Sequence, residues 1–148
     1  MPLPAFNQHG DLPVGVYPLS LAEALARFGA GSSQRQVVAR RLEQIYRVAR
    51  TNAYLARFVV FGSFITAKPA PNDVDVFMLM DDEFAAETLA GEAKLLFDHA
   101  AAQAHFGASV FWLRRQAAFG GEQATIEYWQ VKRGGGQRGI IEILSEQP

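Results

Sequence analysis

The chain has 148 residues, a formal net charge of −1 and no cysteine. This length fits one domain, and the balanced charge provides no global field that would favour nucleic acid or a membrane surface. The lack of cysteine excludes disulfides and thiolate metal sites. We expect one domain over residues 1–148, located in the cytoplasm. We expect no secretory leader, and no membrane span, because no apolar run approaches the roughly 20 residues that a span requires.

The first elements are predicted from prolines and helix caps. Four prolines among residues 1–19 favour an extended arm over regular structure: Pro2, Pro4, Pro13 and Pro18. Ser20 and Glu23 have the spacing of a capping box, which predicts a helix from residue 20 to about 28. A second, longer helix is predicted over residues 33–54, beginning with a cap at Ser33.

The second helix and its exit are rich in arginine: Arg35, Arg40, Arg41, Arg47, Arg50 and Arg57. A basic helix face can bind nucleic-acid phosphates. A solvated face, or pairing with acids elsewhere in the fold, is the preferred interpretation, because no aromatic residues alternate with the arginines to stack on bases.

The middle of the chain alternates between strands and helices. β-branched and aromatic residues predict strands over residues 57–61, 73–80 and 108–113, and a final strand over residues 139–144. An alanine-rich segment predicts a helix over residues 82–105. Residues 122–133 fit a helix or a strand, and a helix is preferred. The expected fold class is α/β or α+β, with a mixed central sheet flanked by helices.

Four residues around the first two of these strands carry the chemistry. Gly62 lets a phosphate approach the backbone closely, and Ser63 offers a hydroxyl and an N–H group. Asp73 and Asp75 are two residues apart on a strand, so their side chains leave from the same face. Two carboxylates on one face suit magnesium bridging to substrate phosphates.

This pattern of a strand, Gly62-Ser63, a loop and Asp73-Val74-Asp75 resembles the nucleotidyltransferase superfamily of the DNA-polymerase-β type. Residues 62–75 look more narrowly like a group of small, mostly uncharacterised bacterial proteins with this fold. The resemblance implies a minimal nucleotidyltransferase fold. It also implies that Asp73 and Asp75 bind Mg²⁺, with Mn²⁺ as the alternative, and that Gly62 and Ser63 hold the phosphates of a nucleoside triphosphate.

The superfamily usually has a third carboxylate on the following strand, and here no acid lies in residues 108–112. Ser109 is expected at that position. Glu127 or Glu142 could substitute from another element. Two carboxylates, triphosphate oxygens and water can still hold one magnesium ion, so nucleotide binding is less affected than turnover.

Two functions follow from the resemblance. The first is a magnesium-dependent transfer of a nucleoside monophosphate from a nucleoside triphosphate to a hydroxyl of an unknown acceptor. The second is a non-catalytic module that binds a nucleotide or a protein. Small members of the superfamily are often paired with a helical partner in toxin–antitoxin or defence systems, so a protein partner or a second copy of this chain is conceivable.

Other candidate residues receive structural interpretations. Lys68 could reach a triphosphate, but a solvated loop lysine is the preferred interpretation. Four aromatic residues late in the chain are expected to be core residues rather than a base-stacking surface: Phe111, Trp112, Tyr128 and Trp129.

Overall fold

The computed structural model describes residues 3–118 and 120–145. Within them, five strands form one mixed sheet in the order β1-β5-β2-β3-β4. The strands are β1 (Val16–Leu19), β2 (Leu55–Phe61), β3 (Val74–Met80), β4 (Ala108–Arg114) and β5 (Ile140–Ile143). Pairing is parallel for β1–β5 and β3–β4 and antiparallel for β2–β5 and β2–β3. The expected mixed α/β architecture is confirmed.

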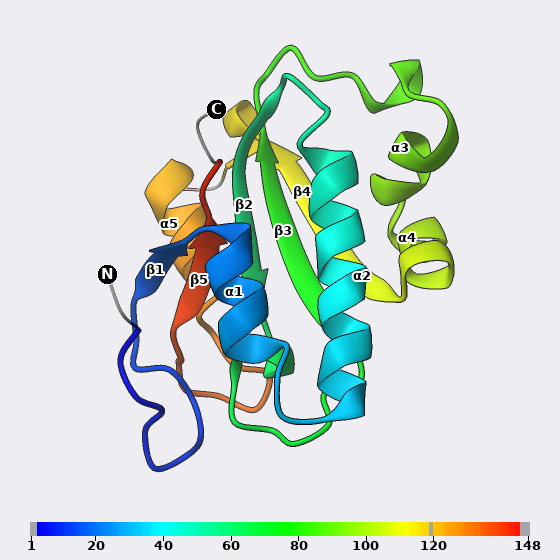
Figure 1. Ribbon diagram of the computed structural model, residues 1–148. Helices are drawn as coiled ribbons and strands as arrows, with labels where there is room; N and C mark the ends of the chain where they lie inside the picture. Colours follow the sequence, from blue (N-terminus) through cyan, green and yellow to red (C-terminus); the bar gives the residue numbers. More distant parts are fainter. Residues whose placement is uncertain (1–2, 119, 146–148) are drawn as a thin grey trace.

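The helices lie on both faces of this sheet (Figure 1). α1 (Leu21–Phe28) and α2 (Ser33–Ala49) cover one face, and α3 (Gly91–Leu96) and α4 (His99–Phe106) lie beside α2 towards β4. α5 (Glu122–Tyr128) lies against the opposite face. No helix among the described residues is both long and apolar enough to span a membrane.

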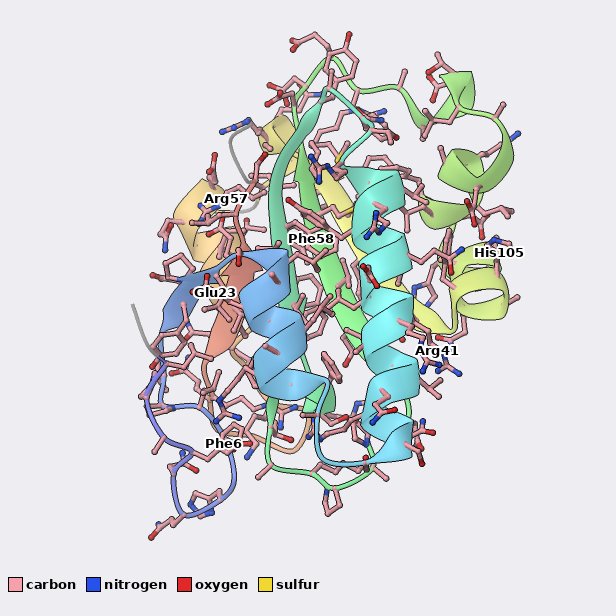
Figure 2. All side chains as sticks on the ribbon, in the orientation of Figure 1. Phe6, Glu23, Arg41, Arg57, Phe58 and His105 are labelled. Carbon is pink, nitrogen blue, oxygen red and sulfur yellow. The ribbon has the colours of Figure 1, made fainter. Side chains whose placement is uncertain are left out.

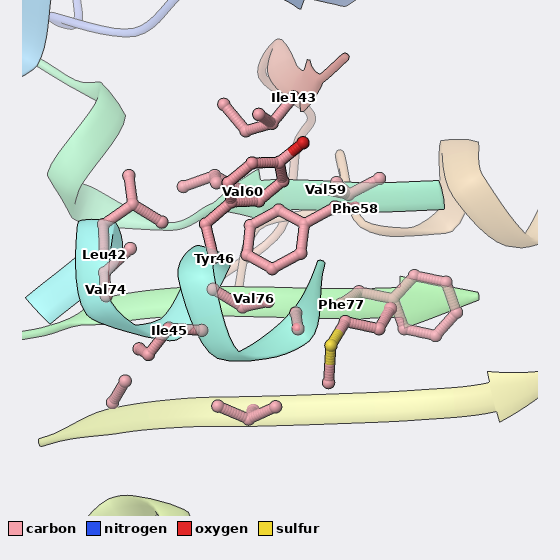
Figure 3. Close-up of a cluster of buried hydrophobic side chains, with 14 of the residues drawn as sticks. Leu42, Ile45, Tyr46, Phe58, Val59, Val60, Val74, Val76, Phe77 and Ile143 are labelled. Atoms are coloured by element: carbon pink, nitrogen blue, oxygen red, sulfur yellow. The ribbon is translucent and has the colours of Figure 1, made fainter. Parts of the chain in front are cut away.

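The main core lies between α2 and the centre of the sheet (Figure 3). Leu42, Ile45 and Tyr46 of α2 face Val60 of β2 and Val76 of β3, and all five side chains are buried. Apolar residues at helical spacing on α2 therefore meet apolar residues at alternate strand positions, as their periodicities predict.

Alternation along β2 separates the two faces of the sheet (Figure 2). Phe58 packs edge-on against Tyr46 of α2, with ring centroids 5.0 Å apart. Its neighbour Arg57 points to the α5 face, where it forms ion pairs with Glu122 (3.1 Å) and Glu142 (2.6 Å). The hydrogen bonds and charges of both glutamates raise the pKa of Arg57.

The N-terminal prediction is partly wrong. Residues 1–2 of the predicted arm lie outside the described residues, and residues 3–19 do not form an arm without regular structure, because Val16–Leu19 pair with Ile140–Ile143 as the edge strand β1. Pro18 is tolerated there because an edge strand needs hydrogen bonds on one side only. Leu12 is fully buried in the core, so this segment belongs to the body of the domain.

Helix boundaries show the other corrections. The capping box of Ser20 and Glu23 is confirmed. α2, however, has Ser32 rather than Ser33 as its cap, and it ends at Ala49 rather than near residue 54. Asn52 accepts a hydrogen bond from the backbone N–H of Tyr54, a local turn that competes with further helix.

The predicted helix over residues 82–105 is wrong for residues 82–90, which hold only a 3₁₀ turn at Ala86–Thr88, and the remainder is divided into α3 and α4. The side chain of Asp98 accepts a hydrogen bond from the N–H of Ala101 and begins a new helix there. The preferred helix over residues 122–133 is confirmed only as far as Tyr128.

Arg35 connects α2 to the loop that follows β2. It is buried, and its guanidinium donates hydrogen bonds to four backbone carbonyls, those of Phe28, Phe64, Thr66 and Lys68, at 2.6–3.0 Å. The sequence interpretation of Arg35 as part of a solvated or acid-paired basic face is therefore wrong. This guanidinium fixes the path of residues 64–68 relative to α2.

We predict that Arg35→Met destabilises the protein by about 3 kcal/mol, because several buried carbonyls lose their donor. Urea unfolding followed by circular dichroism measures the change. Arg40→Met, an exposed position on the same helix, is the matched control and is expected to change the free energy of unfolding by less than about 0.5 kcal/mol. Equal effects of the two substitutions would contradict the bracing role of Arg35.

Candidate functional site

The candidate site lies where β2 ends and β3 begins, on the α5 face of the sheet. Asp75 is the register partner of Phe61 on β2 and of Ser109 on β4. Gly62 follows Phe61 directly, and Asp73 lies just before β3. The structure therefore brings Gly62, Asp75 and Ser109 together, with Ser109 beside Asp75 as the resemblance led us to expect.

Gly62 is the residue against which Asp75 packs. A Cβ atom at position 62 would overlap the carboxylate oxygen Oδ2 of Asp75, and the backbone has a φ of 86°. Both the space and the left-handed backbone require glycine here. Gly62 thus lets the Asp75 carboxylate lie directly on the backbone where β2 turns into the following 3₁₀ turn, Ser63–Ile65.

Burial strongly affects the ionisation of Asp75. Burial first, and the neighbouring negative charge of Asp73 second, raise the pKa of Asp75 from 3.8 to about 6. A hydrogen bond from Ser109 and the positive charges of Arg133 and Arg138 oppose this rise. The site therefore holds a carboxylate whose negative charge is poorly compensated by the protein.

Ser109 occupies the position at which the resemblance places a third carboxylate. Its hydroxyl lies within hydrogen-bond reach of Asp75 and is 3.2 Å from Oε1 of Gln103. A hydroxyl has one proton, so it serves Asp75 when the amide of Gln103 is turned to donate. Ser109 can orient Asp75, but it adds no negative charge.

No third acid completes the pair within residues 3–118 and 120–145, where no cluster of three Asp, Glu, His or Cys side chains is arranged to hold a metal ion. Glu142 is committed to Arg57, and Glu127 is an exposed residue that accepts a hydrogen bond from Gln123. Neither substitutes for the missing carboxylate.

As carboxylates, Asp73 and Asp75 have the donor chemistry that a magnesium ion takes. Carboxylate oxygens are the ligands that Mg²⁺ prefers, and this ion commonly takes one or two carboxylates together with substrate phosphates and water. A cation beside Asp75 would also relieve the repulsion that raises its pKa. The donor set suits a metal that arrives with a phosphate ligand better than one bound by protein alone.

Ser63 and Lys68, the other residues predicted to bind phosphate, make no contact with the two aspartates among the interactions described. Ser63 is half-buried, and its carbonyl accepts hydrogen bonds from both the N–H and the hydroxyl of Thr66. Lys68 is exposed, and its backbone carbonyl is held by Arg35. Among the described residues, no contact joins the Lys68 ammonium to Asp73 or Asp75.

Sequence reasoning missed the basic loop that lies near the carboxylates. Arg133 and Arg138 are the positive charges that act on Asp75. The loop between them carries three consecutive glycines, and it is closed by a bridge between Val131 and Gln137. Basic residues flanking a glycine run were the available signal.

Asp11 anchors this loop. It is buried and forms ion pairs with Lys132 (2.7 Å) and Arg138 (3.3 Å). Burial opposes its ionisation, but the hydrogen bonds and charges of both partners outweigh burial and hold the pKa of Asp11 below its usual value. The N-terminal segment therefore fixes the basic loop beside the site.

A family model matches residues 4–144 of the chain, and its description is a family of unknown function, DUF6932. Searches of curated proteins and of solved structures found no match.

The raised pKa of Asp75 predicts a specific dependence of stability on pH. The folded protein holds this proton more tightly than the unfolded chain, so Asp75 costs stability as the pH rises from about 4 to 6 and above. We expect Asp75→Asn to raise the free energy of unfolding at pH 8 by about 1–3 kcal/mol, with little gain at pH 4. Urea unfolding across this range measures it.

The exposed acid Glu83 provides the control, since Glu83→Gln should leave the pH profile unchanged. A profile for Asp75→Asn that runs parallel to that of the wild type would show that burial does not penalise this carboxylate.

Proposed function

The chain belongs to DUF6932, a family of unknown function, and we propose that this member binds a magnesium nucleoside triphosphate at Asp73 and Asp75. The observation that carries the proposal is the packing of Asp75 against the backbone of Gly62, with Asp73 beside it. Here an anionic pair lies next to a glycine turn that admits close approach.

The surrounding charges support a polyanionic ligand held through a cation. Asp73 and Asp75 would repel a bare triphosphate, whereas a magnesium ion between them and the phosphates satisfies both. Arg133 and Arg138 supply positive charge near Asp75, and Arg133 is exposed. The resemblance to nucleotidyltransferases motivates the nucleoside triphosphate as the ligand class.

Of the two functions, the binding module is better supported. In a transfer reaction, the acceptor oxygen would bond to the α-phosphorus, the bond to pyrophosphate would break, and the hydroxyl proton would need an acceptor. The superfamily uses a third carboxylate for that proton. In this chain Ser109, which is not a base at neutral pH, is paired in register with Asp75.

Transfer of a nucleoside monophosphate to a hydroxyl is the second candidate. It is favoured by the pairing of β3 with a parallel β4 that places residue 109 directly beside Asp75. The order of strand, glycine turn, paired carboxylates and neighbouring strand agrees with the arrangement that the resemblance implies. In this second candidate, Asp73 and Asp75 would bind the metal ion, solvent would accept the proton, and the reaction would be slow.

We predict that the wild type binds a nucleoside triphosphate only when Mg²⁺ is present, and that Asp73→Asn/Asp75→Asn abolishes this binding. Calorimetric titration with each of the four ribonucleoside triphosphates, with and without Mg²⁺, measures it. Glu83→Gln/Glu87→Gln removes the same charge from exposed positions and should bind as the wild type does. A folded wild type that binds no triphosphate would refute the proposal.

Turnover distinguishes the two candidates. We expect the wild type to release no measurable pyrophosphate from a bound triphosphate, because no third carboxylate assists. We expect Ser109→Asp to release it with water as the acceptor. Ser109→Asn is the control without a new charge. Pyrophosphate release by the wild type that disappears in Asp73→Asn/Asp75→Asn would instead establish the transferase.

A further inference from the structure

Aromatic side chains lie beside the carboxylate pair on the same face of the sheet. Phe61 is the register partner of Asp75, and Phe111 lies two residues beyond Ser109 on β4. Because alternate residues of a strand share a face, Asp75, Phe77, Ser109 and Phe111 all point towards α5. Two residues along a strand and one strand across place Phe111 about 8 Å from Asp75.

Trp129, at the end of α5, packs against this group of rings. Its indole centroid lies 4.5 Å from the ring of Phe61, 5.0 Å from that of Phe77 and 5.3 Å from that of Phe111. The interplanar angles are 31–34°, so the rings are closer to stacked than to edge-on. Trp129 therefore holds the neighbouring rings in fixed orientations.

This aromatic group, Phe61, Phe77, Phe111 and Trp129, is buried at one end and open at the other. Phe77 is fully buried, whereas Phe111 keeps 37% of its surface exposed, and the adjoining Tyr128 keeps 62%. The sequence expectation that Phe111 and Tyr128 are core residues is therefore wrong. Trp112, which points to the opposite face, packs edge-on against Phe84 and Phe97.

The exposed end of the aromatic group, at Phe111, is apolar and lies next to the site of Asp73 and Asp75. The imidazole of His99 lies 4.9 Å from the Phe111 ring, tilted by 37°, while its Nδ1 is 3.2 Å from the carbonyl of Val110. Phe111 is thus contacted by the rings of both His99 and Trp129. An exposed aromatic ring that is held in place is a favourable surface for a flat π-system, because little side-chain entropy is lost on contact.

We propose that Phe111 and Trp129 form a stacking surface for the base of a nucleoside triphosphate whose phosphates lie at Asp73 and Asp75. This inference rests on the proposed function and adds the recognition of the nucleoside. The triphosphate end is assigned to the carboxylates and the basic loop around Arg133, and the base to the aromatic surface across β3 and β4. One ligand then spans both features.

The surface implies weak selection among bases. Every base has a π-face, so stacking tolerates all of them, and larger purine rings gain more contact than pyrimidines. The site should therefore prefer a nucleoside triphosphate to inorganic tripolyphosphate, with purines ahead of pyrimidines.

Calorimetric titration of ATP, CTP and tripolyphosphate with Mg²⁺ tests the proposal. We expect Phe111→Ala to weaken ATP binding by about 5- to 100-fold, and Phe111→Trp to retain it. Binding of tripolyphosphate should stay unchanged in both variants. Phe111→Leu keeps apolar volume without a ring and should resemble Phe111→Ala. Tyr54→Ala, an exposed aromatic in the turn between α2 and β2, is the matched control.

The outcomes separate the two proposals. Equal binding of ATP and tripolyphosphate, unaffected by Phe111→Ala, would overturn the stacking surface and leave the carboxylate site intact. A folded wild type that binds neither ATP nor tripolyphosphate would overturn both the stacking surface and the carboxylate site. Sedimentation analysis adds one further test, because a wild-type dimer that Phe111→Ala converts to a monomer would show that this surface contacts a second copy instead. Melting curves confirm that each variant is folded.

Discussion

A carboxylate on the most buried strand of the sheet is the constraint around which the site is organised. β3 is an interior strand between β2 and β4, and Val74 and Val76–Met80 are fully buried, so Asp75 interrupts an otherwise apolar strand. Burial and the nearby Asp73 charge both disfavour its ionised form. An uncharged side chain at this position would remove that cost, and under the proposed function a bound cation would compensate the charge.

Two buried ionic anchors keep the segments around this carboxylate in place. Arg35 fixes the loop after Gly62 through backbone carbonyls, and Asp11 fixes the basic loop through Lys132 and Arg138. These anchors come from segments that are distant in sequence, α2 and the N-terminal region. Each buried charge is costly alone and is tolerated because several hydrogen bonds satisfy it. The site therefore combines strand residues with the loops beside them, and the positions of those loops depend on the core.

The sequence predicted the elements better than their ends, and the carboxylates better than their surroundings. The apolar periodicity of α2 and the continuous apolar run of β3 are strong local signals, and both elements were confirmed. The division of α3 from α4 depends on one side-chain cap at Asp98, which an alanine-rich composition conceals. The β1 strand could not be predicted locally, because its pairing partner β5 lies more than a hundred residues away.

The partners of the charged side chains could not be predicted from the sequence either, because they too are distant along the chain. Arg35 looked like one arginine among six on a basic helix, and only the folded chain shows that it is buried against carbonyls. Arg133 and Arg138 have no special spacing relative to Asp75 in the sequence. They come near it because β5, which follows them, pairs with β2. Gly62 and Asp75 could be paired in advance because a glycine turn and a short strand lie within one local segment.

The balance between binding and turnover follows from how charge is distributed over this face. Under the proposed function, binding requires only that a cation join two carboxylates to phosphate oxygens, and Asp73 and Asp75 would supply those carboxylates. Turnover requires in addition a group that accepts a proton beside the same metal, and β4 places a hydroxyl there. The proposed stacking surface, two residues further along β4, would contribute to holding a ligand and nothing to breaking a bond. The proposal therefore favours retention of a nucleotide over its consumption.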